Sequence, residues 1–199
     1  TNRGRLKAVC VYCASSEKVG EPYRAAAREL GRLLGTRGIE LVYGGAAIGL
    51  MGEVARGVHD RGGSVVGVLP RFFMKKGIRY DEADDLIVTR DMRQRKAIMD
   101  ERAAAFIVLP GGIGTLEEAM EILSMVQLKL TAKPLVFINT CGFFDEILAH
   151  FKKMVDLDFA KPQTLEMFGV VPGPREALDY INRVRSPEGG SPHGGGKGR

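Results

Sequence analysis

Hydrophobic and polar positions follow two alternating patterns along the chain. Short, nearly continuous apolar runs indicate strands buried on both faces, at residues 6–13, 40–45, 64–70, 85–89, 105–110, 133–139 and 168–172. Longer stretches with apolar residues at helical spacing lie between or after them, at residues 21–38, 48–63, 92–104, 115–128, 143–155 and 174–184. This alternation predicts right-handed βαβ units. We therefore expect an α/β fold, a single-domain Rossmann-like parallel sheet with helices on both faces.

The length of 199 residues fits one domain, which we place at residues 1–185. From Ser186 the chain reads SPEGGSPHGGGKGR, which cannot bury apolar surface, so residues 186–199 are expected to form a disordered Gly/Pro-rich tail. No run approaches the roughly 18 apolar residues of a membrane span, and no charged-then-apolar leader is present. We expect a cytoplasmic protein that has no membrane partner.

Charge and cysteine usage narrow the classes of partner. The formal net charge of +5 is modest, and no basic stripe with interleaved aromatic residues appears, so no nucleic-acid partner is expected. Three cysteines do not make a disulfide framework, which indicates a reducing compartment. Cys10 and Cys13 form a C-x-x-C, but their odd separation within one strand places them on opposite faces. Because the three histidines are also far apart in sequence, we expect no metal site.

Four segments with candidate ligand-binding chemistry stand where predicted strands end and helices begin. They are residues 13–16, residues 44–52, the start of the helix at Met92, and residues 110–118. In open α/β sheets, ligands bind at the carboxyl ends of the strands. The four segments are therefore expected to converge on one crevice.

Residues 109–118 read LPGGIGTLEE, a strand end followed by three glycines and a helix that we expect to begin at Thr115. Three interpretations compete: a dinucleotide site, a phosphate site, or a tight turn before a capped helix. The dinucleotide fingerprint fails because Glu117 stands where a third glycine is needed, and no Gly-Lys-Ser/Thr marks a P-loop. Backbone N–H groups at the helix start still favour an anion. Thr115 and Glu118 equally match a capping box.

The helix predicted from Met92 carries charge on its apolar stripe. Met92 and Met99 define that stripe, and Arg95 and Lys96 fall within it. An unpaired buried charge is costly, so the arginine needs a partner. Two are available, the carboxylate of Glu118 or a bound anion, and an internal ion pair without chemistry is the structural alternative.

Two motifs together resemble one family. PGGIGTLEE matches the P-G-G-x-G-T-x-x-E signature, and MRQRKAIM resembles the companion Arg-Lys helix, of the LONELY GUY (LOG) proteins, which are cytokinin riboside 5′-monophosphate phosphoribohydrolases. The resemblance runs from VCVYCASS through YGGAAIGLMG to KPLVFINTCGFFDEIL, nearly the whole chain. Members have often been labelled lysine decarboxylases, although nothing in this sequence marks a lysine for pyridoxal phosphate.

The resemblance implies a reaction and an assembly. The reaction is hydrolysis of the N-glycosidic bond of an N6-substituted adenosine 5′-monophosphate, which gives the free base and ribose 5-phosphate without metal or cofactor. The assembly is a homodimer, with a higher oligomer left open. The preferred base, plain adenine or an N6-modified one, is also left open.

The resemblance further implies the site residues. Arg95 and Glu118 match the family's catalytic arginine and glutamate. Substrate contacts are assigned to Ser15, Gly45, Met92, Lys96, Gly111, Gly112, Ile113, Gly114, Thr115, Glu117 and Ser124. The turn from Gly112 to Thr115 takes the phosphate-binding role. A non-catalytic carrier of a nucleotide or of molybdenum cofactor, with similar glycine-rich loops on the same scaffold, is the alternative function.

Overall fold

The computed structural model describes residues 5–74 and 77–186. Within them one seven-stranded parallel sheet has the order β4-β3-β2-β1-β5-β6-β7. The strands are β1 (Ala8–Tyr12), β2 (Glu40–Tyr43), β3 (Val65–Pro70), β4 (Asp85–Thr89), β5 (Phe106–Val108), β6 (Leu135–Ile138) and β7 (Gly169–Val171). The α-helices are α1 (Glu21–Arg37), α2 (Gly49–His59), α3 (Met92–Arg102), α4 (Ile113–Gln127), α5 (Asp145–Asp156) and α6 (Pro174–Arg185). Short 3-10 turns are η1 (Arg71–Phe73), η2 (Thr140–Gly142) and η3 (Pro162–Glu166).

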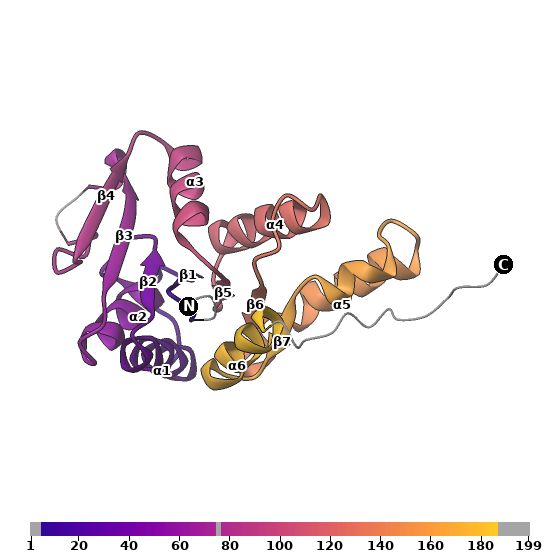
Figure 1. Cartoon of the computed structure of the whole chain (residues 1–199), viewed down its shortest axis with the longest axis horizontal. Coiled ribbons are helices and arrows are strands. Elements are labelled where there is room, and N and C mark those ends of the chain that lie inside the picture. Colours follow the sequence, from indigo (N-terminus) through magenta and orange to yellow (C-terminus); the bar gives the residue numbers. More distant parts are fainter. Residues whose placement is uncertain (1–4, 75–76, 187–199) are drawn as a thin grey trace.

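The helices form two layers, one on each face of the sheet (Figure 1). Apolar residues of α1, α2 and α6 pack on one face, and those of α3, α4 and α5 pack on the other. Both strand faces are therefore buried, which explains the continuous apolar runs in the sequence. Cys10 and Cys13 belong to opposite core clusters, as their odd separation predicts. The predicted Rossmann-like sheet with helices on both faces is confirmed.

The order of the strands reverses next to β1. The chain builds outward from β1 through β2 and β3 to β4, then returns so that β5 pairs with the free side of β1, with Tyr12 opposite Val108. Connections on the two sides of this point diverge to opposite faces of the sheet. The carboxyl ends of β1 and β5 are consequently the place where an open parallel sheet can bind a ligand.

The segment between β3 and β4 lies against the loop that follows β2. The N–H of Ala47 donates to the carbonyl of Ile78 at 2.7 Å, and the N–H of Tyr80 donates to the carbonyl of Gly45 at 2.9 Å. These bonds bring Ile78 to the carboxyl ends of the strands, although no hydrophobic period in the sequence marks this segment.

The predicted tail falls almost entirely on residues 187–199, which lie outside the described residues. Its disorder therefore stays a prediction. Among the helices that the structure describes, none combines the length and apolar character needed to cross a membrane.

Candidate active site

A pocket of about 540 Å³ opens at the carboxyl ends of β1, β2, β3 and β5. All four predicted segments contribute to it, so their convergence is confirmed. Its walls are Cys13, Ala14, Ser15, Ser16, Gly44, Ala46, Ile48, Met51, Leu69, Phe73, Ile78, Met92, Arg95, Gly112, Gly114, Thr115 and Glu118.

Arg95 and Glu118 form a buried ion pair at this pocket. Nη1 of Arg95 lies 3.0 Å from Oε1 of Glu118, and the two side chains are 8% and 6% exposed. Nε of Arg95 also donates to the carbonyl of Val68 at 2.9 Å. The arginine of α3 is thus fixed to both β3 and α4, and of its two expected partners the structure shows the carboxylate of Glu118.

Burial changes the acidity of this carboxyl. It raises the pKa of Glu118 from 4.5 to about 7, because desolvation of the carboxylate outweighs the opposing attraction of Arg95. The neighbouring charge of Glu117 adds to the increase. A carboxyl with a pKa near neutrality can exchange a proton at physiological pH, as a general acid or base requires.

The N-terminus of α4 is arranged differently from the sequence prediction. The helix begins at Ile113 rather than Thr115, its N-cap is Gly112, and no side chain caps it. The predicted capping box of Thr115 and Glu118 is therefore wrong: Thr115 already lies within the first turn, and Glu118 binds Arg95 instead. With no side chain bound to the free N–H groups of the first turn, this helix end is available to an anion.

Two glycines at this helix start line the pocket, and neither has to be glycine to avoid a clash with the surrounding protein. A Cβ built on Gly112 or Gly114 meets nothing within 4 Å, and neither residue has a positive φ. Gly111 differs, because its Cβ would lie 2.1 Å from Oγ1 of Thr115. The empty space in front of Gly112 and Gly114 is suited to a ligand that approaches the backbone closely.

Seven of the thirteen predicted site residues meet at the pocket: Ser15, Met92, Arg95, Gly112, Gly114, Thr115 and Glu118. The other six lie nearby but belong to its surroundings. Lys96 forms ion pairs with Glu117 and Glu121 on α4, and Oγ of Ser124 donates to the carbonyl of Met120 at 2.9 Å. Ile113 is 83% exposed. Substrate contacts for Gly45, Lys96, Gly111, Ile113, Glu117 and Ser124 stay predictions.

Several wall residues were not predicted from the sequence. Phe73 and Ile78 come from the irregular segment between β3 and β4, where neither pattern nor motif signals a site. Met51 lies two positions inside α2 and also reaches the pocket. Cys13 also lines it, but burial raises the pKa of its thiol, so the cysteine stays protonated rather than a thiolate nucleophile.

A larger hollow of about 710 Å³ lies over α1, α2 and α6 and is rich in arginine. Its charges are largely neutralised by acidic neighbours, since Arg32 pairs with Asp60 and Arg175 pairs with Glu29. Within residues 5–74 and 77–186, no three histidine, cysteine or carboxylate side chains gather as a metal site. Of these two places, the pocket at the carboxyl ends of the strands is the candidate site, because it contains a buried ion pair beside a free helix N-terminus.

Fold and pocket together define a Rossmann-type α/β protein with an anion-accepting helix start beside a buried Arg–Glu pair. The family model described as "Possible lysine decarboxylase" matches residues 51–181. Cytokinin riboside 5′-monophosphate phosphoribohydrolase LOG5 of Arabidopsis thaliana is 40% identical over 183 residues, covering 92% of this chain and 80% of the relative. The probable phosphoribohydrolase LOGL9 of Oryza sativa is 42% identical over 171 residues, covering 86% of this chain and 75% of the relative. The chain belongs to the LONELY GUY (LOG) family.

Solved structures share the fold. The molybdenum cofactor binding protein of Rippkaea orientalis aligns with a TM-score of 0.70 at 21% identity, over 92% of this chain and 99% of that chain. The molybdenum cofactor carrier protein of Chlamydomonas reinhardtii aligns with a TM-score of 0.67 at 26% identity, over 90% of this chain and 98% of that chain. Proteins named as binding or carrying molybdenum cofactor therefore share this arrangement of sheet and helices.

Proposed function

We propose that this protein hydrolyses the N-glycosidic bond of an adenosine 5′-monophosphate, plain or N6-substituted, to the free base and ribose 5-phosphate. The observation that carries the proposal is the pair of Arg95 and Glu118, buried at the same pocket that the free N-terminus of α4 lines. Relatives named as phosphoribohydrolases of this kind are 40% identical over 92% of the chain, which supports the same reaction class.

Glu118 is the proposed catalytic carboxyl. Cleavage of a ribosyl C–N bond builds positive charge on the sugar and negative charge on the departing base, and an enzyme has to stabilise both. An ionised Glu118 near C1′ stabilises the oxocarbenium-like centre and orients or deprotonates the attacking water, a role that carboxylates have in glycoside hydrolysis. Its pKa of about 7 suits a group that takes up the proton of that water.

Arg95 and the start of α4 hold the rest of the substrate in this proposal. Arg95 keeps the Glu118 carboxylate in place through a 3.0 Å contact from Nη1. We assign a contact with the nucleotide to its Nη2, which packs beside Gly44 at the pocket. The 5′-phosphate binds the N-terminus of α4, in the space before Gly112 and Gly114. Binding energy from this remote phosphate then fixes the geometry at the reacting bond.

We also propose that the protein is a homodimer and acts in the cytoplasm. Three apolar side chains of α4 and the segment after it are largely exposed, namely Ile113, Leu128 and Leu130. Exposed apolar side chains near one helix are suited to burial against a second copy. Light scattering on the purified protein tests the mass, with twice the 21.7 kDa of one chain expected.

A base-release assay tests the function. The protein is incubated with AMP, with N6-isopentenyl AMP and with the matching nucleosides, and free base is separated by chromatography. Base is expected from the monophosphates and much less from the nucleosides; equal rates would remove the phosphate role from α4. Comparing the two monophosphates also answers which base is preferred.

Variants connect the activity to the site. Glu118→Gln and Arg95→Ala should each lower kcat at least ~100-fold, the loss typical of a positioned catalytic group. Glu29→Gln is the control, because it removes a partly exposed carboxylate that pairs with Arg175, away from the pocket. Full activity of Glu118→Gln contradicts the assignment, whereas nucleotide binding without base release in the unchanged protein would indicate a carrier.

A further inference from the structure

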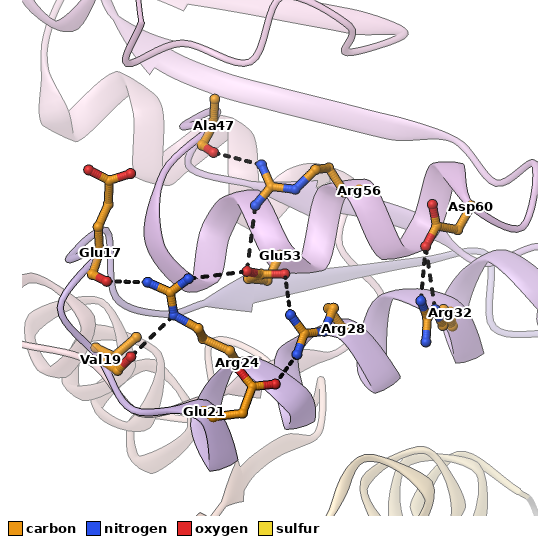
Figure 2. A network of polar contacts seen from close by, with 10 residues as sticks. All are labelled: Glu17, Val19, Glu21, Arg24, Arg28, Arg32, Ala47, Glu53, Arg56 and Asp60. Carbon is orange, nitrogen blue, oxygen red and sulfur yellow. Dashed lines mark hydrogen bonds and ion pairs between the residues drawn. The ribbon is translucent and has the colours of Figure 1, made fainter.

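Glu53 is a buried acidic residue outside the pocket. It lies on α2 facing α1, with the residue 8% exposed, and three guanidinium groups surround its carboxylate (Figure 2). Nη1 of Arg28 lies 3.3 Å from Oε2, while Nη1 of Arg24 and Nη2 of Arg56 lie 3.7 Å and 3.8 Å from Oε1. Glu21 also binds Arg28, so Glu53 is the carboxylate common to all three arginines and the one that holds Arg24 and Arg56 together (Figure 2).

Two of these arginines also bind loop carbonyls. Nε of Arg24 donates to the carbonyl of Val19 at 3.2 Å, and its Nη2 donates to the carbonyl of Glu17. Nη1 of Arg56 donates to the carbonyl of Ala47 at 2.9 Å (Figure 2). The loop after β1 and the loop after β2 are thus connected to the same buried carboxylate.

Both loops are walls of the candidate active site. Ser15 and Ser16 precede the carbonyls that Arg24 binds, and Ala46 and Ile48 flank the carbonyl that Arg56 binds; all four line the pocket. The loops touch directly as well, since a Cβ on Gly49 would lie 2.5 Å from the carbonyl carbon of Ser15. Arg24 and Arg56 therefore connect both of these walls to Glu53.

We propose that Glu53 is a positioning residue, which acts through Arg24 and Arg56 to hold the two pocket loops at the separation that nucleotide binding requires. The inference rests on the proposed function in taking a nucleoside 5′-monophosphate as the ligand. Glu53 acts on substrate affinity rather than on the chemical step, because its arginines bind loop carbonyls at Glu17, Val19 and Ala47. The Arg95 head group is fixed separately, by Val68, by Glu118 and by close packing against Gly44. Without the negative charge of Glu53, Arg24 and Arg56 lose the carboxylate oxygen that they share, and the carbonyls that they bind move with them.

The test is AMP affinity, measured by titration calorimetry in a Glu118→Gln background where turnover does not interfere. Glu53→Gln should weaken AMP binding roughly tenfold, a loss of the size expected when charge-assisted contacts such as those to Arg24 and Arg56 are removed. In proteins that keep Glu118, the same substitution should raise KM and leave kcat within about twofold. Arg24→Gln and Arg56→Gln should each give a smaller loss of the same kind. Glu53→Asp, which keeps the charge, should recover part of the affinity.

Arg32→Gln is the matched control. It removes an ion pair between the same two helices, in which Nη2 of Arg32 lies 3.3 Å from Oδ2 of Asp60, farther along the helices from both loops (Figure 2). Its AMP affinity should equal that of the parent. Equal affinity of the Glu53→Gln and Arg32→Gln proteins, or a loss in kcat alone, overturns the proposal. If Glu53→Gln fails to fold, the two loop-binding arginines, which are partly exposed, provide the same comparison.

Hydrogen exchange separates this inference from the proposed function. Amides of residues 14–19 and 46–48 should exchange faster in Glu53→Gln, Arg24→Gln and Arg56→Gln than in Arg32→Gln. If the unchanged protein releases no base, the proposed function fails while this comparison still decides whether Glu53 positions the loops. Unchanged exchange in both loops contradicts the positioning role whatever the activity.

Discussion

Gly44 and Arg95 are packed so closely that no side chain fits between them. A Cβ built on Gly44 would lie 2.2 Å from Nη2 of Arg95, while the other nitrogens of the guanidinium are fixed by Val68 and Glu118. The backbone at the end of β2 therefore determines where the head group of the arginine lies relative to the carboxyl of Glu118.

Gly44→Ala should lower kcat at least about tenfold, because the added methyl displaces the Arg95 guanidinium by more than hydrogen-bond geometry tolerates. We expect a stability loss of about 1–3 kcal/mol, as for other overpacked sites, measured by urea denaturation beside the base-release rate. Gly20→Ala is the control, since its Cβ would meet Pro22 at an ordinary 3.7 Å. A Gly44→Ala protein with the parent kcat would mean that Arg95 does not need its observed position.

Gly114→Ala should separate stability from phosphate binding. The residue lies in the first turn of α4 with open space around its Cβ, and alanine is a better helix former by about 1 kcal/mol. The melting temperature should hold or rise. The methyl group occupies the space assigned to the 5′-phosphate, so the preference of kcat/KM for monophosphate over nucleoside should fall. An unchanged preference would place the phosphate elsewhere.

The pH dependence of kcat/KM should report the ionisation of Glu118. If the carboxylate form reacts, the rate rises with pH through an apparent pKa near 7, the value to which burial raises this group. The free substrate phosphate titrates in a similar range, at about 6, so a variant has to separate the two. Because Glu117 raises the pKa of Glu118, Glu117→Gln should move the rise to lower pH, whereas the titration of the free substrate cannot move. A rise that stays in place argues against Glu118 as its source.

The free energy of unfolding should also depend on the ionisation of Glu118, and the direction of its change with pH can be stated. The pKa of Glu118 is raised from 4.5 unfolded to about 7 folded, so the folded state binds the extra proton. The corresponding stability is fully present below pH 4.5 and is lost as pH rises through 7. Relative to the unchanged protein, Glu118→Gln should therefore gain up to about 3 kcal/mol between pH 4.5 and 8, measured by denaturation at each pH. A constant difference would mean that the carboxyl ionises at its ordinary pKa.

The strands and helices of the structure could be predicted from the sequence. Continuous apolar runs such as residues 105–110 indicate strands covered on both faces. Strands of this kind that alternate with helices imply a parallel sheet with helices on either side. The buried position of Arg95 also followed from local information, because it shares a stripe with Met99 on one helix. Glu118 was one of two partners expected for it, because α3 and α4 come directly before and after the same strand, β5.

Features that depend on contacts between segments far apart in the sequence could not be predicted from the sequence. Thr115 and Glu118 match a capping box by spacing, but the pairing with Arg95 and the earlier helix start at Ile113 override that local pattern. Glu53 looks like an ordinary polar residue of a helix, since the partners on α1 that bury it lie 25 or more residues away in sequence. Phe73 and Ile78 reach the pocket through backbone bonds that no side-chain pattern encodes.

The burial of Glu118 has a consequence for how the sequence can change. Removing this carboxyl alone would leave the Arg95 guanidinium buried without its partner, which is costly. The positions of Arg95 and Glu118 are consequently expected to change together rather than one at a time. Reconstructed ancestral sequences can test this, by asking whether the residues equivalent to Arg95 and Glu118 change on the same branch.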